Sequence, residues 1–393
     1  MRFEFATVGR IVFGWGVADE LGEIAASLGR RALVVVGSRT LDQAGAVDRL
    51  ASRLTARQVD VVVFRTRGEP DVELVDAGAR QAVEAGRDLV VGLGGGSALD
   101  AAKAIAGLAA NGGSALDYME VVGQGRTLTR PALPVIAVPT TAGTGAEVTR
   151  NAVIAAKDRA FKASIRSAYL LPRVALVDPA LTASLSPEVT ASTGLDALTQ
   201  LVEAFVSRRA SPVTEALARE GIRRASRSLP RAYGHGDDTA AREDMCLASL
   251  LSGIALANAG LGAVHGFASP LGGMFPVPHG VACAALLPHV MAANVRALRA
   301  REPDGPTLAK YAEVGEVLVG RRLGSEAETI DAGVQVLAEM CRQMGIPPLR
   351  EFGIRREDVP GIVVQAEGAS STRGNPITLT CEELTEALLA AVG

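Results

Sequence analysis

Short apolar runs alternate with longer amphipathic stretches through the first half of the chain. The stretches at 41–56 and 72–85 have the apolar spacing of surface helices. Because buried parallel strands read as continuous apolar runs, strands separated by helices predict a parallel sheet covered by helices on both faces. The first residues, through Phe13, read as one more strand. The other runs that predict strands are 31–38, 60–64, 88–96, 134–141 and 174–178.

The pattern changes near Ser186, and no convincing strand-rich run follows it. Stretches with helical periodicity fill this half instead. We therefore predict two domains, an α/β nucleotide-binding domain at 1–185 and an all-α domain at 186–393. Since no Pro- or Ser-rich linker separates them, we expect the domains to pack directly with a cleft between them. The clearest helical stretches are 191–206, 212–225, 239–260 and 325–344.

The composition of the chain bears on whether it binds nucleic acid or a membrane. A net charge of −3 over 393 residues gives no reason to expect nucleic acid or an anionic membrane as a partner. No apolar run reaches the ~18 residues of a membrane span, and the N-terminus lacks the apolar segment of a signal peptide. The four cysteines form no C-x-x-C pair, so we expect buried free thiols in a reducing cytoplasm. They are Cys246, Cys283, Cys341 and Cys381.

Two small-residue loops carry the first candidate chemistry. The run from Asp88 leads into Gly94, Gly95, Gly96 and Ser97, where a helix is expected to begin. Bare glycine backbone at a helix N-terminus lets a pyrophosphate approach the N–H groups. A second loop follows the next strand and supplies hydroxyl donors at Thr140, Thr141 and Thr144. Two such loops at neighbouring strand ends predict a Rossmann-like dinucleotide site, although the G-x-G-x-x-G fingerprint is absent.

These loops belong to a set of motifs that resembles the iron-containing (group III) alcohol dehydrogenases. The motifs follow the order of that family through nearly the whole chain. The resemblance implies the dehydroquinate-synthase-like fold, with an α/β domain and a helical domain. The motifs are FGWG from Phe13, GEPDVELV from Gly68, GGGSALDAAKAIA from Gly94, PTTAGTGAEVT from Pro139, LPRVALVDPALT from Leu171, STGLDALTQLVEAFVS from Ser192 and HGFASPLGGMFPVPHGVACAALLPHV from His265.

The resemblance implies roles for the loop residues. Gly94 to Ser97 would cradle the pyrophosphate, and the three threonines would line the path from phosphate to nicotinamide. Asp100 would face the nicotinamide side of the cleft, Val153 would flank the ring, and Lys162 would lie near the ribose.

The type of nicotinamide cofactor depends on the segment after the second strand. NAD-preferring relatives have an acid there, whereas this chain has Gly37, Ser38 and Arg39. No carboxylate repels a 2′-phosphate, and Ser38 and Arg39 can donate to one. The sequence therefore favours NADP, or the use of both NADP and NAD.

The resemblance also implies one divalent metal, iron or zinc, held by an Asp and three His. The matching positions are Asp196, Gln200, His265 and His279, so a glutamine replaces one histidine. An amide oxygen is a weaker ligand than imidazole for these metals, so the site is weakened or empty. Asp196, His265 and His279 are the expected catalytic residues. Ser269 stands where many relatives have a further histidine that relays protons.

The expected function is hydride transfer between NAD(P) and a small alcohol or aldehyde, assisted by the metal. We expect a homodimer, as the resemblance implies. Three alternatives remain open. They are a metal-independent reductase like maleylacetate reductase, a lyase like dehydroquinate synthase, and a nucleotide-binding protein that has lost catalysis.

Overall fold

The computed structural model describes residues 2–37, 45–66, 68–159 and 161–393. The chain divides into two compact units. One unit runs from Ala6 to Ala183, and the other from Ser184 to Gly393 together with the residues before Ala6.

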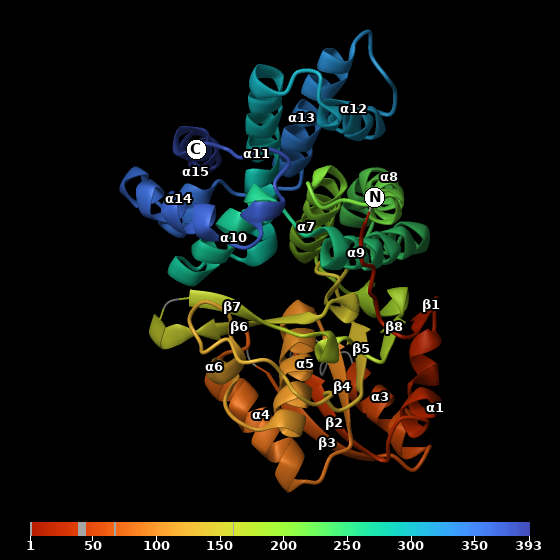
Figure 1. Ribbon diagram of the computed structural model, residues 1–393. Coiled ribbons are helices and arrows are strands. Elements are labelled where there is room, and N and C mark those ends of the chain that lie inside the picture. Colours follow the sequence, from red (N-terminus) through yellow and green to blue (C-terminus); the bar gives the residue numbers. More distant parts are fainter. Residues whose placement is uncertain (1, 38–44, 67, 160) are drawn as a thin grey trace. The chain divides into compact units, whose positions relative to one another are not determined.

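The first unit contains a six-stranded sheet in the order β1-β8-β5-β4-β2-β3 (Figure 1). Every neighbouring pair of strands in it is parallel, which confirms the predicted parallel sheet. The strands are β1 (Ile11–Phe13), β2 (Arg31–Val36), β3 (Asp60–Arg65), β4 (Leu89–Gly94), β5 (Val135–Pro139) and β8 (Val174–Val177).

Helices cover both faces of this sheet. Along β2, Leu33 and Val35 belong to a buried cluster with residues of α4 and α5, whereas Ala32, Val34 and Val36 pack with residues of α1 and α3. The alternation follows from the two-residue period of a strand. The helices of this unit are α1 (Leu21–Ala26), α3 (Ala46–Thr55), α4 (Val72–Glu84), α5 (Gly96–Asn111) and α6 (Ala115–Tyr118).

A two-stranded hairpin beside the sheet was not predicted. It pairs β6 (Asn151–Ala156) with β7 (Phe161–Arg166) in antiparallel register. Ala152, Ile154 and Ala156 are buried and join the cluster of α4 and α5. The hairpin therefore lies on the α5 face, beside the loop that follows β5.

The second unit is helical, as predicted. The helices α7, α8 and α9 pack against one another, and α11 packs against α7, α10, α13 and α15 (Figure 1). The α8 helix continues to Gly234, past its predicted end at 225, with Pro230 inside it. The helices are α7 (Pro187–Val206), α8 (Pro212–Gly234), α9 (Thr239–Ala259), α10 (Ala263–Met274), α11 (His279–Arg301), α12 (Pro306–Val319), α13 (Glu326–Gln343), α14 (Val359–Gly368) and α15 (Cys381–Val392).

One described helix, α11, is long and apolar enough to meet a test for a membrane span, with a mean hydropathy of 1.5 in its most apolar window. However, 72% of this window is buried inside the protein, and buried core helices of soluble proteins pass the same test. The α9 and α10 helices also pass as a pair, but with a bend of 100° between them.

Candidate functional site

The nucleotide loops of the first unit lie at the carboxyl ends of adjacent parallel strands. β4 ends at Gly94, and α5 begins two residues later at Gly96. The Thr140 N–H, just after β5, donates to the Gly94 carbonyl at 3.0 Å. Gly95 is the N-cap of α5, and no side chain caps the helix there. The first N–H groups of a helix attract anions, so this end of α5 suits a phosphate.

The glycines in these loops are required by close packing. A Cβ atom at Gly96 would lie 2.7 Å from the Thr144 methyl group, and one at Gly95 would lie 3.3 Å from Thr141. A Cβ atom on Gly94 or Gly37 would meet the same Ala98 methyl group, at 2.7 Å and 3.0 Å. The structure thus brings the two predicted loops and Gly37 together.

The remaining cofactor candidates lie on α5 and on the hairpin, except Ser38, which is outside the described residues. Ser97 is half-buried in the first turn of α5. The Asp100 carboxylate accepts from the Val153 N–H at 3.0 Å and pairs with Lys103 at 2.8 Å, so it joins α5 to β6. Lys162, on β7, forms an ion pair with Glu69.

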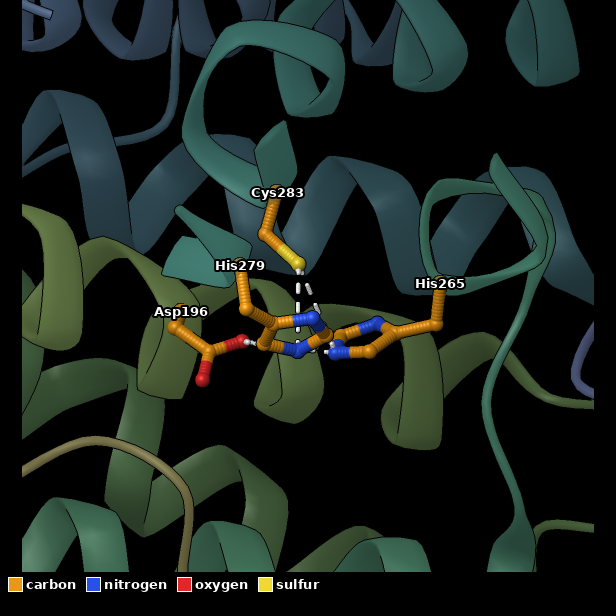
Figure 2. Close-up of side chains that lie close together, drawn as sticks. All are labelled: Asp196, His265, His279 and Cys283. Carbon is orange, nitrogen blue, oxygen red and sulfur yellow. Dashed lines mark hydrogen bonds and ion pairs between the residues drawn. The ribbon is translucent and has the colours of Figure 1, made fainter. Parts of the chain in front are cut away.

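A cluster of possible metal ligands lies in the second unit. Asp196 is on α7, His265 is in the first turn of α10, and His279 and Cys283 are in the first turns of α11. One ligand atom from each residue lies within 4.8 Å of all the others. Figure 2 shows the four side chains pointing toward one another.

The Asp196 carboxylate is the unusual member of this cluster. Its Oδ1 atom is buried and accepts no hydrogen bond. It lies 3.3 Å from Nε2 of His265 and 3.6 Å from Nε2 of His279, within ion-pair distance but not aligned for a hydrogen bond. A buried carboxylate oxygen without a partner is costly, so this position calls for a cation.

Glu203, one helical turn beyond Gln200, fixes the ring of His265. Its Oε2 atom lies 2.6 Å from His265 Nδ1, and its Oε1 atom accepts from the Val264 N–H at 2.8 Å. When Nδ1 carries the proton of this bond, the lone pair of a neutral ring is at Nε2, which faces Asp196. Metal-binding histidines are oriented in this way by an outer carboxylate.

The ionisable groups of the cluster shift one another's pKa values. Burial opposes the charged form of His265, yet its interactions with Cys283 and Glu203 raise its pKa well above the ordinary value. The interaction with Cys283, followed by that with Asp196, raises the pKa of His279 to about 9. Since 44% of the His279 side chain is exposed, solvent weakens this effect. Burial would raise the pKa of Asp196, but His279 and His265 hold it below its usual value. The cluster thus favours positive charge.

Gln200 lies beside this cluster with both ends of its amide engaged. Its nitrogen donates to Asp196 Oδ2 at 3.1 Å, and its oxygen accepts from the Ser252 hydroxyl at 2.7 Å. In this arrangement the amide oxygen faces Ser252. Ser269 lies one turn beyond His265 on α10, on the same face of that helix.

Cys283 was missed as a candidate because only C-x-x-C spacing was considered. Two ligands on a helix can also be four residues apart, and His279 and Cys283 have that spacing on α11. The i, i+4 pair was the signal available in the sequence.

Comparison with known proteins identifies the family. The model of the iron-containing alcohol dehydrogenases matches residues 9–179, and that of the Fe-containing alcohol dehydrogenase family, C-terminal, matches residues 190–392. The chain belongs to the iron-containing alcohol dehydrogenase family. It is accordingly an oxidoreductase of a family that uses NAD(H) and a divalent metal.

Individual relatives of this iron-containing alcohol dehydrogenase match over nearly its full length. Alcohol dehydrogenase 4 of Saccharomyces cerevisiae is 37% identical over 374 residues, which cover 95% of this chain and 94% of the yeast protein. The NAD-dependent methanol dehydrogenase of Bacillus methanolicus is 32% identical, with 97% of each chain covered. The crystal structure of a 1,3-propanediol oxidoreductase superimposes with a TM-score of 0.92, at 34% identity, with 100% of each chain covered.

Proposed function

We propose that this protein interconverts a small alcohol and its aldehyde with NAD or NADP, using a divalent metal held by Asp196, His265 and His279. The observation that carries the proposal is the buried Oδ1 atom of Asp196, which accepts no hydrogen bond and lies within 4 Å of Nε2 of both histidines. Carboxylate and imidazole are ligands for both iron and zinc, so the donor set fits the metal of the family.

Residues of this chain position the ligand atoms for the metal. Asp196 and the two histidines approach a single point, and Glu203 holds the His265 ring so that Nε2 faces that point. When bound, the divalent cation supplies Lewis-acid polarisation of the substrate oxygen. A serine hydroxyl does not titrate near neutrality, so Ser269 would not act as a general acid or base.

Gln200 acts, in this proposal, as a positioning residue rather than as a ligand. Its donation to Asp196 Oδ2 fixes the carboxylate, while Ser252 holds the other end of the amide. Oδ1 of Asp196 is then left for the cation.

The nucleotide is assigned to the loops after β4 and β5. The uncapped N-terminus of α5 and the bare backbone of Gly95 and Gly96 suit the pyrophosphate. Ser38 and Arg39 would receive a 2′-phosphate, so we propose that NADP is accepted as well as NAD.

We also propose a cytoplasmic homodimer. Strand β1 is at the edge of the sheet, and the side chains of Ile11 and Trp15 near it are each 39% exposed. A second copy could cover this apolar surface. Analytical ultracentrifugation tests the dimer, and a monomer at micromolar concentration contradicts it.

The experiment starts from protein stripped of metal by a chelator and then dialysed. Adding Fe²⁺ or Zn²⁺ should restore alcohol-dependent reduction of NAD⁺ or NADP⁺, followed by the absorbance of the reduced cofactor. Asp196→Asn should abolish the restored rate. The control His235→Ala, in an exposed histidine at the end of α8, should leave it unchanged. Full activity in the stripped protein would instead favour the metal-independent reductase, and no activity under either condition would favour the non-catalytic alternative.

A further inference from the structure

The residue that closes the metal cluster is a cysteine. Cys283 is fully buried on α11, one turn after His279. Its Sγ atom lies 3.7 Å from Nε2 of His265 and 3.7 Å from Nε2 of His279 (Figure 2). A thiol has one proton and cannot donate to both rings at once.

The distances match the edges of a tetrahedron around a metal. Ligand bonds of about 2.0–2.3 Å in tetrahedral geometry place nitrogen and oxygen atoms about 3.4 Å apart, and nitrogen and sulfur atoms about 3.6 Å apart. Here the two N–O distances are 3.3 and 3.6 Å, and the two N–S distances are both 3.7 Å. Four of the six distances among the ligand atoms thus match a tetrahedral site, and all of them are within 4.8 Å.

Gln200 does not compete for this fourth position, because its oxygen faces Ser252 and its nitrogen faces Asp196. Resting on the proposed function, which supplies the metal, we propose that Cys283 binds the cation as a thiolate and completes an Asp–His–His–Cys centre. The thiol proton leaves to solvent when the metal binds.

The same donor set predicts which metal the centre prefers. Thiolate is a soft ligand, and tetrahedral sites of sulfur and nitrogen favour zinc over iron. The two negative ligands, Asp196 and Cys283, balance the charge of a divalent ion in a buried position. The centre should therefore retain Zn²⁺ in competition with Fe²⁺.

The test is cobalt substitution, because Co²⁺ bound to a thiolate absorbs in the near ultraviolet and Co²⁺ bound only to nitrogen and oxygen does not. Metal-free protein is titrated with Co²⁺ under a phosphine reductant, so that no added thiol competes. The wild type should develop the charge-transfer band to saturation at one Co²⁺ per chain. Cys283→Ser should lose the band, and its zinc affinity should fall by more than the roughly 10–100-fold that removal of an outer-shell partner costs.

Cys341→Ser is the matched control, since Cys341 is also buried but lies on α13 with its thiol donating to the Ala284 carbonyl. It should keep both the band and the affinity, and circular dichroism of each metal-free variant should show an intact fold. X-ray absorption of the zinc protein should find one sulfur at about 2.3 Å.

A metal bound through nitrogen and oxygen alone, or a band that survives Cys283→Ser, overturns the proposal while leaving the proposed function standing. Failure to bind Co²⁺ at all also overturns it. If sulfur coordination is found but no alcohol reduces NAD⁺ or NADP⁺, the proposal stands and the proposed function fails.

Discussion

His265 and Glu203 form a buried pair in which Nδ1 of the ring lies 2.6 Å from Oε2 of the carboxylate. The same carboxylate accepts the Val264 N–H through its other oxygen, so one side chain positions both the start of α10 and the imidazole that α10 carries. No local sequence pattern points to this pair, because the two residues are 62 positions apart.

This relationship leads to the first prediction. Glu203→Gln places an amide group against His265 Nδ1 and removes the negative charge that orients the ring. Zinc affinity, measured by competition with a chromophoric chelator, should fall about 10–100-fold. Glu215→Gln, which breaks an ion pair with Lys310 in the same unit, should leave the affinity unchanged.

The second prediction tests whether Gln200 positions Asp196 or binds the metal itself. Gln200→Ala leaves Asp196 Oδ2 without its Gln200 donor, while the Ser252 hydroxyl keeps the Ser249 carbonyl as an acceptor, so the free energy of unfolding should fall by about 1–3 kcal/mol. Zinc content by elemental analysis should stay close to one per chain. A loss of zinc affinity larger than the roughly 10–100-fold that removal of an outer partner costs would show that Gln200 is a ligand. Gln343→Ala, in an exposed glutamine on α13, is the control.

The third prediction concerns the nucleotide loop. Gly96→Ala drives a methyl group against Thr144, and such overpacking costs about 1–3 kcal/mol. Because the strain falls where α5 begins, we expect a higher Kd for NADH or NADPH, measured by fluorescence titration, with zinc content unchanged. Gly361→Ala in α14, where a Cβ atom meets nothing within 4 Å, should leave the Kd as it is. Equal nucleotide affinity in the two variants would show that this loop does not bind the nucleotide.

The fourth prediction addresses the cofactor type. Arg39 lies outside the described residues, and its contact with a 2′-phosphate is inferred from the sequence. Arg39→Ala removes a charged donor worth about 1.5–3 kcal/mol to a phosphate, and kcat/KM for NADP⁺ should therefore fall roughly 10- to 100-fold. The value for NAD⁺ should hardly change. An equal loss for both cofactors would contradict a 2′-phosphate contact.

The fifth prediction is a pH dependence of stability in the first unit. Burial raises the pKa of Glu147 to about 7 from its ordinary value of 4.5, with Lys103 partly opposing the shift. The folded state then holds a proton that the unfolded state releases, so this group's contribution to stability is full below pH 4.5 and declines up to pH 7. The expected loss is on the order of 3 kcal/mol.

Glu147→Gln should remove that decline. Thermal unfolding of the wild type and the variant from below pH 4.5 up to pH 7.5 measures the difference, which should shift in favour of the variant as the pH rises. A constant difference across this range would mean that Glu147 is ionised throughout.

The sheet could be predicted from the sequence because its strands are buried on both faces, which makes them continuous apolar runs. The β6–β7 hairpin lacked that signal, since only alternate residues such as Ala152 and Ile154 are buried. Asp196, His265 and His279 came from motif resemblance. Their convergence with Cys283 depends on three helices packing together, which no local pattern encodes.

Whether the cluster binds a metal is tested by the metal content of protein purified without chelators, determined beside that of Asp196→Asn. We predict close to one divalent ion per wild-type chain and a large loss in the variant. An empty wild-type protein that still oxidises alcohols with NAD⁺ or NADP⁺, and gains nothing from added zinc or iron, would contradict it.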